Sequence, residues 1–145
     1  MRIIVQRVSH ASVSVDGQIV GQIGMGLVLL IGFRESDTEE ELAFWADKCT
    51  HLRIFNDPDE KMNLSLLDVG GEILAISQFT VYGDARKGRR PSFTDAAKPE
   101  IAEPLYLRFI ALLRKKGIRV AAGIFGAMME VEIHNSGPVT IILEK

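Results

Sequence analysis

The fold class is decided by Leu27-Val28-Leu29-Leu30-Ile31, an uninterrupted apolar run. A strand with one face in water alternates apolar and polar residues, whereas a strand that is covered on both faces is apolar throughout. A second run, Glu72–Phe79, is almost as apolar. Both runs therefore predict buried strands.

The residues before the first run predict β-hairpins. Ile3–Val8 is mostly apolar, and Ala11–Val15 alternates apolar and polar residues as a half-buried strand does. Asp16-Gly17 is a strong hairpin signal, because both turn positions need a positive φ. Gln18–Ile23 is then expected to return as the next strand.

Two later segments show the apolar spacing of helices. Ser36 and Glu39 have the form of a capping box, and the first helix is expected to run from there to about Phe55. The second helix is expected to carry Pro104 in its first turn and to end at Gly117. The expected core positions of the two helices are Leu42, Trp45, Ala46, Cys49 and Leu52, and Leu105, Phe109, Leu112 and Leu113.

Three more strands are expected at about 118–124, 127–134 and 138–144, and residues 56–63 are expected to form a polar loop. In the strand that ends at His134, alternation should turn Met129 inward and His134 toward solvent. The sequence thus predicts a single α/β domain over residues 1–145, rich in sheet, with β-hairpins at the N-terminus and two main helices.

Composition narrows the class of protein. A chain of 145 residues with 47% hydrophobic and 25% charged residues is typical of a globular domain. It has no apolar run near the ~20 residues that span a bilayer and no signal-peptide pattern, so no membrane association is expected. With Cys49 as the single cysteine, no internal disulfide can form, which favours the cytoplasm. The net charge of −2 means that a nucleic-acid partner would need a local basic patch.

The sequence gives little support for a metal site or for a nucleophilic catalytic side chain. His10, His51 and His134 are far apart in the sequence and none has metal-ligand spacing, so neither a metal nor a cofactor is expected. There is no G-x-S-x-G motif. Cys49 lies on the apolar stripe of a predicted helix and is interpreted as a core residue.

Two segments have no simple structural explanation. At the end of a buried strand, Ser77–Asp84 gathers hydroxyl and amide side chains, which either bond within the protein or line a ligand site. Directly behind it come the cations Arg86, Lys87, Arg89 and Arg90. They form either a solvated loop or a phosphate anchor. The second segment, Asn135–Thr140, contains Gly137-Pro138, which is either an ordinary turn or a cis peptide bond kept for a reason.

Together these segments resemble a known family. Ser77–Asp84 (Ser-Gln-Phe-Thr-Val-Tyr-Gly-Asp) resembles the S-Q-F-T-L-Y-G-D signature of D-aminoacyl-tRNA deacylases, and Asn135–Thr140 resembles their N-x-G-P-V-T motif. Gln6-Arg7-Val8, residues 86–93 and Phe125-Gly126-Ala127 match as well. The resemblance covers essentially the whole chain. Its visible departures are Val81, a conservative change from Leu, and Ser136 where Asp is common.

The resemblance implies a homodimer that hydrolyses D-aminoacyl-tRNA at active sites on the subunit interface. It assigns the pocket floor and catalysis to Ser77, Gln78, Phe79 and Thr80, with the Phe79 N–H as the oxyanion donor. A cis Gly137-Pro138 would reach into the neighbouring subunit's pocket and exclude L-substrates, while glycyl esters pass.

The same resemblance gives supporting roles to other residues. Met129 is expected to line the adenosine pocket, Arg7 to brace the Gly-Pro loop, and Arg86, Lys87, Arg89 and Arg90 to bind tRNA. Thr80 has no evident base, which favours attack by water with help from the terminal 2′-hydroxyl. Two alternatives stay open: an editing deacylase with relaxed or L-amino-acid selectivity, and a non-catalytic RNA-binding module.

Overall fold

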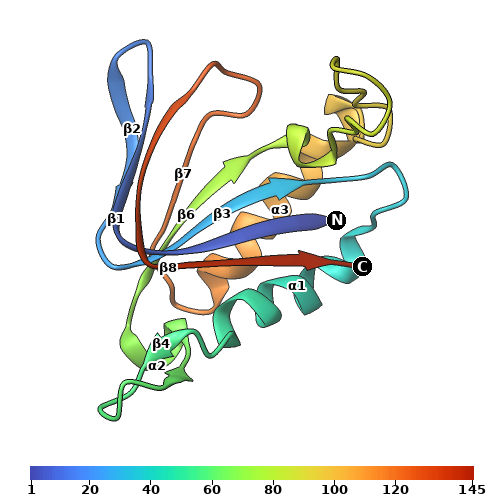
Figure 1. Cartoon of the computed structure of the whole chain (residues 1–145). Coiled ribbons are helices and arrows are strands. Elements are labelled where there is room, and N and C mark those ends of the chain that lie inside the picture. Colours follow the sequence, from blue (N-terminus) through green and yellow to red (C-terminus); the bar gives the residue numbers. More distant parts are fainter.

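The computed structural model describes residues 1–145, and a curved sheet with helices on one side dominates it (Figure 1). Along the chain the elements are β1 (Arg2–Val15), β2 (Gln18–Ile23), β3 (Gly26–Gly32), α1 (Glu39–His51), β4 (Phe55–Asn56), β5 (Met62–Leu64), α2 (Leu66–Val69), β6 (Glu72–Ser77), the 3-10 helix η1 (Phe79–Tyr82), α3 (Pro99–Lys115), β7 (Val120–Ala122) and β8 (Glu130–Glu144). The α/β class predicted from the sequence is confirmed.

The main sheet is organised around β1. Its strand order is β2-β1-β3-β6-β7, and β8 pairs antiparallel with β1 along nearly the whole length of both strands. β3, β6 and β7 are parallel to one another, so their carboxyl ends lie at one edge. A Cβ on Gly21 would lie 2.9 Å from the Ala122 carbonyl oxygen. β2 therefore lies against β7, and the sheet is nearly closed.

The two faces of the sheet bury different side chains. The larger core lies between the sheet and the helices α1 and α3, where Ile3, Leu29 and Ile73 meet Trp45 and Phe109. The inner face of the curved sheet holds a smaller cluster: Val8, Ala11, Val13, Ile23, Val28, Leu74 and Ile76. The two-sided burial of β3 and β6 explains why their sequences are almost wholly apolar.

Several predicted boundaries were wrong. Residues 2–15 form one strand instead of two, because β8 pairs along both halves. α1 begins after Thr38 with no side-chain cap, so the Ser36 capping box is absent, and the helix ends at His51. α3 begins at Pro99, five residues before Pro104, because the Ile101 and Ala102 N–H groups both bond to the Lys98 carbonyl. Gly117 follows the C-cap with φ +79°, as expected.

The remaining differences lie in short elements. The polar loop contains the small hairpin β4–β5, and it is followed by α2, which Ser65 and Asp68 cap reciprocally. The strand expected at 118–124 is shortened to β7, and those expected at 127–134 and 138–144 are one strand, β8. None of the helices has the length and apolar character needed to cross a membrane.

Candidate active site

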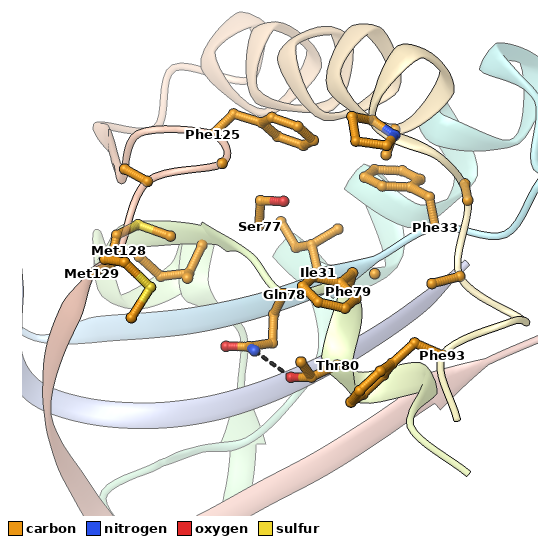
Figure 2. Close-up of a pocket in the computed structure, with 18 of the residues that line it drawn as sticks. Ile31, Phe33, Ser77, Gln78, Phe79, Thr80, Phe93, Phe125, Met128 and Met129 are labelled. Atoms are coloured by element: carbon orange, nitrogen blue, oxygen red, sulfur yellow. Dashed lines mark hydrogen bonds between the residues drawn. The ribbon is translucent and has the colours of Figure 1, made fainter. Parts of the chain in front are cut away.

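A cavity of about 630 Å³ opens at the carboxyl ends of β3, β6 and β7 (Figure 2). This edge is where ligands bind in sheets of parallel strands, and the volume is ordinary for a small-molecule site. The cavity is mostly apolar, and its lining residues are Ile31, Gly32, Phe33, Ile76, Ser77, Gln78, Phe79, Thr80, Phe93, Ala96, Ala97, Pro99, Ala102, Phe125, Gly126, Ala127, Met128, Met129 and Val131.

The polar groups of the cavity come from the end of β6. The Gln78 N–H donates to the Ile31 carbonyl at 2.7 Å, which extends the β3–β6 pairing by one residue before the chain turns into η1. The first N–H groups of a helix, here those of Phe79 and Thr80, have no acceptor inside the helix. Figure 2 shows Ser77 between Ile31 and Phe125, and the Gln78 side-chain amide donating to the Thr80 hydroxyl.

Close packing fixes the position of η1. A Cβ on Gly32 would lie 2.4 Å from the Val81 side chain and 3.1 Å from the Gln78 carbonyl oxygen, so only glycine lets η1 approach β3 this closely. Tyr82 is buried, and the guanidinium carbons of Arg2 and Arg34 each lie 4.8 Å from its ring centre. Burial raises the pKa of Tyr82 to about 12. η1 is therefore anchored through Tyr82, which does not line the cavity.

No side chain that lines the cavity can ionise near neutral pH. Ser77 and Thr80 supply hydroxyls and Gln78 supplies an amide, but the lining contains no carboxylate, imidazole, amine or thiol. General acid–base catalysis usually needs one of those groups. The polar chemistry available here is hydrogen bonding from the main chain and from neutral side chains.

The Gly137-Pro138 loop is a bulge within β8. Val8 pairs with Asn135 and Gln6 with Thr140, so residues 136–139 bulge out opposite Arg7. The peptide bond between Gly137 and Pro138 is cis. The loop is exposed, and neither residue of the dipeptide lines the cavity of its own chain.

Arg7 braces this loop. Its Nε donates to the Ser136 carbonyl at 3.1 Å, and its Nη1 donates to the Ile54 carbonyl at 2.7 Å and to Asn56 Oδ1 at 3.1 Å. The contact expected between Arg7 and the loop is therefore present. Arg7 makes no salt bridge, so its guanidinium is held by hydrogen bonds to neutral acceptors.

The basic loop lies between Asp84 and Ser92, whose main chains exchange two hydrogen bonds of 2.8 and 2.9 Å. Arg86 forms an ion pair with Asp84 at 2.8 Å and lowers the pKa of that carboxyl to about 2. The other three cations, Lys87, Arg89 and Arg90, are exposed and have no salt-bridge partner. The loop leads directly into Phe93, which lines the cavity.

The structure brings together only part of the residue set predicted from the sequence. Ser77, Gln78, Phe79, Thr80 and Met129 line one cavity. Arg7, Gly137 and Pro138 form a separate group, and the basic loop is connected to the cavity only through Phe93, the residue that follows it. The sequence did not reveal that Gly32, Phe33, Ala96, Ala97, Pro99 and Ala102 line the cavity. One sequence feature could have indicated Gly32: it directly follows the apolar run Leu27–Ile31, where the strand ends.

Two further expectations concern cysteine and histidine. Cys49 is a buried core residue, as predicted, and burial raises the pKa of its thiol to about 12. His134 is exposed, as predicted, but it stacks on His10 with ring centres 3.7 Å apart. Although His10 and His134 are far apart in the sequence, they are neighbours in the structure because β1 and β8 pair there. No three His, Cys, Asp or Glu side chains gather as a metal site.

The fold and the cavity define an α/β protein whose ligand site is built from a strand end and its neutral polar groups. Comparison with known proteins agrees on one family. The family model described as D-Tyr-tRNA(Tyr) deacylase matches residues 4–144. Relatives named D-aminoacyl-tRNA deacylase include one from Geobacillus sp. (strain WCH70), 63% identical, covering 99% of this chain and 95% of its own. Another, from Thermus aquaticus, is 55% identical over the same shares.

Solved structures share the fold. The structure described as c-Myc DNA Unwinding Element Binding Protein has a TM-score of 0.93 at 42% identity, covering 100% of this chain and 99% of its own. A probable eukaryotic D-amino acid tRNA deacylase has a TM-score of 0.85 at 22% identity, covering 98% and 97%. The chain belongs to the D-aminoacyl-tRNA deacylase family, and it is a hydrolase that acts on ester bonds.

Proposed function

We propose that this enzyme hydrolyses the ester that joins a D-amino acid to the 3′ end of tRNA, using main-chain donors at the end of β6. The observation that carries this proposal is the cavity itself. Phe79 and Thr80, whose N–H groups have no acceptor inside η1, are lining residues, and no side chain of the lining is ionisable. Ester hydrolysis needs a stabilised oxyanion and an attacking water; the main-chain donors provide the first, and the substrate itself is left to assist the second.

In the proposed mechanism, the Phe79 N–H donates to the ester carbonyl oxygen as water attacks the carbonyl carbon. Negative charge on that oxygen grows as the carbon becomes tetrahedral, and a donor already in place stabilises it. The bond to the ribose oxygen then breaks, and that oxygen takes up the proton that the attacking water gives up. The 2′-hydroxyl of the terminal adenosine assists the water, since the Thr80 hydroxyl is engaged by Gln78 and has no base beside it.

The apolar part of the cavity is proposed to hold the terminal adenosine. Phe125 and Met129 are lining residues on the side of the cavity away from Thr80 (Figure 2). A nucleobase has two apolar faces, and aromatic rings and methionine sulfur are favourable neighbours for them. Binding the adenosine there would bring its ester to Ser77 and Phe79.

Chiral selection is proposed to come from the Gly137-Pro138 loop of a partner subunit in a homodimer. The loop is exposed, it is held by Arg7, and it does not line the cavity of its own chain. These are the properties expected of a loop that contacts the cavity of a neighbouring subunit. Its carbonyl oxygens would accept hydrogen bonds from the substrate's α-amino group. An L-side chain would then collide with the dipeptide, whereas a glycyl ester has no side chain to exclude.

The basic loop is proposed to contact the tRNA backbone. Lys87, Arg89 and Arg90 are free of internal ion pairs and lie in the loop that leads into Phe93, a residue of the cavity lining. Phosphate contacts of this kind position a nucleic acid without reading its sequence. Since tRNA is the proposed substrate, the cytoplasm is the proposed place of action.

The direct test is to incubate the purified protein, with a chelator present, with D-tyrosyl-, glycyl- and L-tyrosyl-tRNA. Release of D-Tyr and Gly with the L-ester spared is the expected result. Equal cleavage of both enantiomers would instead favour the alternative of an editing deacylase with relaxed selectivity, and no cleavage of any ester would contradict the proposal.

The variant Gly137→Ala tests the role of the loop. Gly137 has φ +120°, and a Cβ there would lie 2.7 Å from Arg7 Nη2, so alanine must displace the loop or its brace. The ratio of D- to L-cleavage should fall at least ten-fold, with a smaller loss of the D-rate. An unchanged ratio would remove the loop from chiral selection.

The other alternative from the sequence, a non-catalytic RNA-binding module, would use the same cations, but membership in a hydrolase family speaks against it. Replacing Arg86, Lys87, Arg89 and Arg90 with Ala separates the two. Under the enzyme proposal, tRNA affinity falls and its salt dependence becomes shallower, while D-tyrosyl-adenosine is still cleaved. A non-catalytic RNA-binding module would lose tRNA binding in the variant, and neither the wild type nor the variant would cleave D-tyrosyl-tRNA or D-tyrosyl-adenosine.

A further inference from the structure

Two phenylalanines at the mouth of the cavity are left in solvent. Phe79 is 54% exposed and Phe93 is 39% exposed. Their rings meet edge to face, with centres 5.2 Å apart and planes at 70°. An edge-to-face pair leaves ring faces free for a further flat ligand. Figure 2 shows Phe93 next to Thr80, on the side of the cavity away from Phe125.

Phe93 is held in place by its surroundings. The Asp84–Ser92 hydrogen bonds close the basic loop immediately before it. A Cβ on Gly83 would lie 3.0 Å from the Phe93 ring, so the ring packs on a bare glycine. A ring fixed in this way loses little conformational freedom when a ligand binds.

Charge identifies the ligand class. The loop that ends at Phe93 carries Lys87, Arg89 and Arg90, which have no salt-bridge partner in a chain whose net charge is −2. Cations beside exposed aromatic rings are the recurring arrangement of single-stranded nucleic-acid sites, in which the cations hold phosphates and the rings stack bases. Met128 is 90% exposed at another part of the cavity, but no comparable group of cations adjoins it in the sequence.

We propose that Phe93 is a stacking platform for the nucleobase next to the terminal adenosine of the RNA, with the connecting phosphates held by the basic loop. This inference rests on the proposed function, because only an RNA ester brings a second nucleotide to the cavity. It assigns the recognition of the acceptor end to a specific aromatic face in addition to the adenosine pocket. Phe79 supports the platform edge-on.

The test compares two substrates: a D-tyrosyl RNA minihelix, and the same minihelix with an abasic residue beside its terminal adenosine. For the wild type, removing the base should lower kcat/KM roughly ten-fold, within the usual range for one base stacked on an aromatic ring. In Phe93→Ala the same removal should change kcat/KM less than two-fold. Phe93→Tyr and Phe93→Trp should restore the ten-fold factor, and Phe93→Leu, the matched apolar control, should not.

Three results would overturn the inference. One is a base effect of equal size in the wild type and in Phe93→Ala. Another is the absence of a base effect in the wild type while D-tyrosyl-adenosine is cleaved, which leaves the proposed function standing. The third is a loss of the dimer in Phe93→Ala and Phe93→Leu, since the ring would then be covered by a protein partner. Failure to cleave D-tyrosyl-adenosine would instead contradict the proposed function itself.

Discussion

Thr80 is the residue whose chemistry is most open to direct measurement. Its hydroxyl accepts a hydrogen bond from Gln78, and no lining residue can take its proton. Thr80→Val removes the hydroxyl and keeps the shape of the side chain. We expect kcat for D-tyrosyl-tRNA to fall less than ten-fold, because the proposed attacking group is water. Single-turnover kinetics would measure this.

The opposite result is equally clear. A loss of three orders of magnitude in Thr80→Val, or a trapped acyl group on Thr80 in the wild type by mass spectrometry, would make this residue the nucleophile. Ser77→Ala removes the other hydroxyl of the cavity at the same strand end and shows by the same measurement whether that hydroxyl, in place of Thr80, is the nucleophile.

Glu144 offers a second prediction at the residue scale. Hydrogen bonds and charge from Arg2, with further charge from Arg34, lower the pKa of this carboxyl from its ordinary value of 4.5. A lowered folded-state pKa stabilises the protein above pH 4.5, and the contribution is lost as the pH falls through the lowered value.

The variant Glu144→Gln should therefore melt about 1 to 3 °C below the wild type at pH 7, because partly exposed ion pairs contribute little. The difference should shrink toward zero as the pH falls below 4. Calorimetry across this range measures it. Glu103→Gln, at an exposed glutamate of α3 without a salt bridge, should show no such trend.

Single residues show what a sequence can and cannot predict. The core position of Cys49 followed from helical spacing, and the inward position of Met129 from strand alternation, because both patterns are local. The stacking of His10 on His134 depends on which strands pair and in which register. The spacing of residues along the chain determines neither the pairing nor the register, so the sequence did not predict this contact.

At the scale of elements, Gly32 sets how closely η1 packs on β3. Gly32→Ala would put a Cβ 2.4 Å from the Val81 side chain, and the cheapest relief is a shift of η1. We expect at least a hundred-fold loss of deacylation, since a displaced oxyanion donor loses most of its effect. The loss should exceed anything that the change in melting temperature explains.

Gly17→Ala is the control for that variant. Gly17 lies in the β1–β2 turn with φ +76° and has nothing within 4 Å of its Cβ position. Alanine there should destabilise the protein by about 1 kcal/mol through backbone strain while activity is retained. Equal activity losses in the two variants would mean that general destabilisation, and not the position of η1, causes the loss.

Elements were predicted better than their ends. Uniform apolar runs identified β3 and β6, and the Asp-Gly turn identified the β1–β2 hairpin. The capping box at Ser36 failed, because Thr38 takes the cap position without any side-chain bond. β8 was split in two because Gly137-Pro138 is typical of a turn, whereas the structure accommodates the pair in a bulge of one strand. Tertiary pairing overrode local turn chemistry there.

At the scale of the whole molecule, the proposal requires two chains for one complete site. Mixed dimers test this directly. One subunit carries Gly137→Ala and keeps its cavity, and the other carries Gly32→Ala and keeps its loop. If the loop acts on the neighbouring cavity, the mixed dimer contains one site with both parts intact. Its D- to L-cleavage ratio should then equal that of the wild type.

Differential tagging isolates the mixed dimer, and the Gly137→Ala homodimer is the control. A mixed dimer as unselective as that homodimer would show that each loop acts within its own chain. A protein of 16.0 kDa that sediments as a monomer at assay concentrations would rule out the shared site altogether.

A cavity without ionisable side chains has a consequence for inhibition. Reagents that acylate activated serines or alkylate thiolates need a nucleophile that the lining does not offer, and the single thiol, Cys49, is sealed in the core with its pKa raised to about 12. An effective blocker would instead have to imitate the tetrahedral shape of the reacting carbon, for example as a phosphonate joined to adenosine.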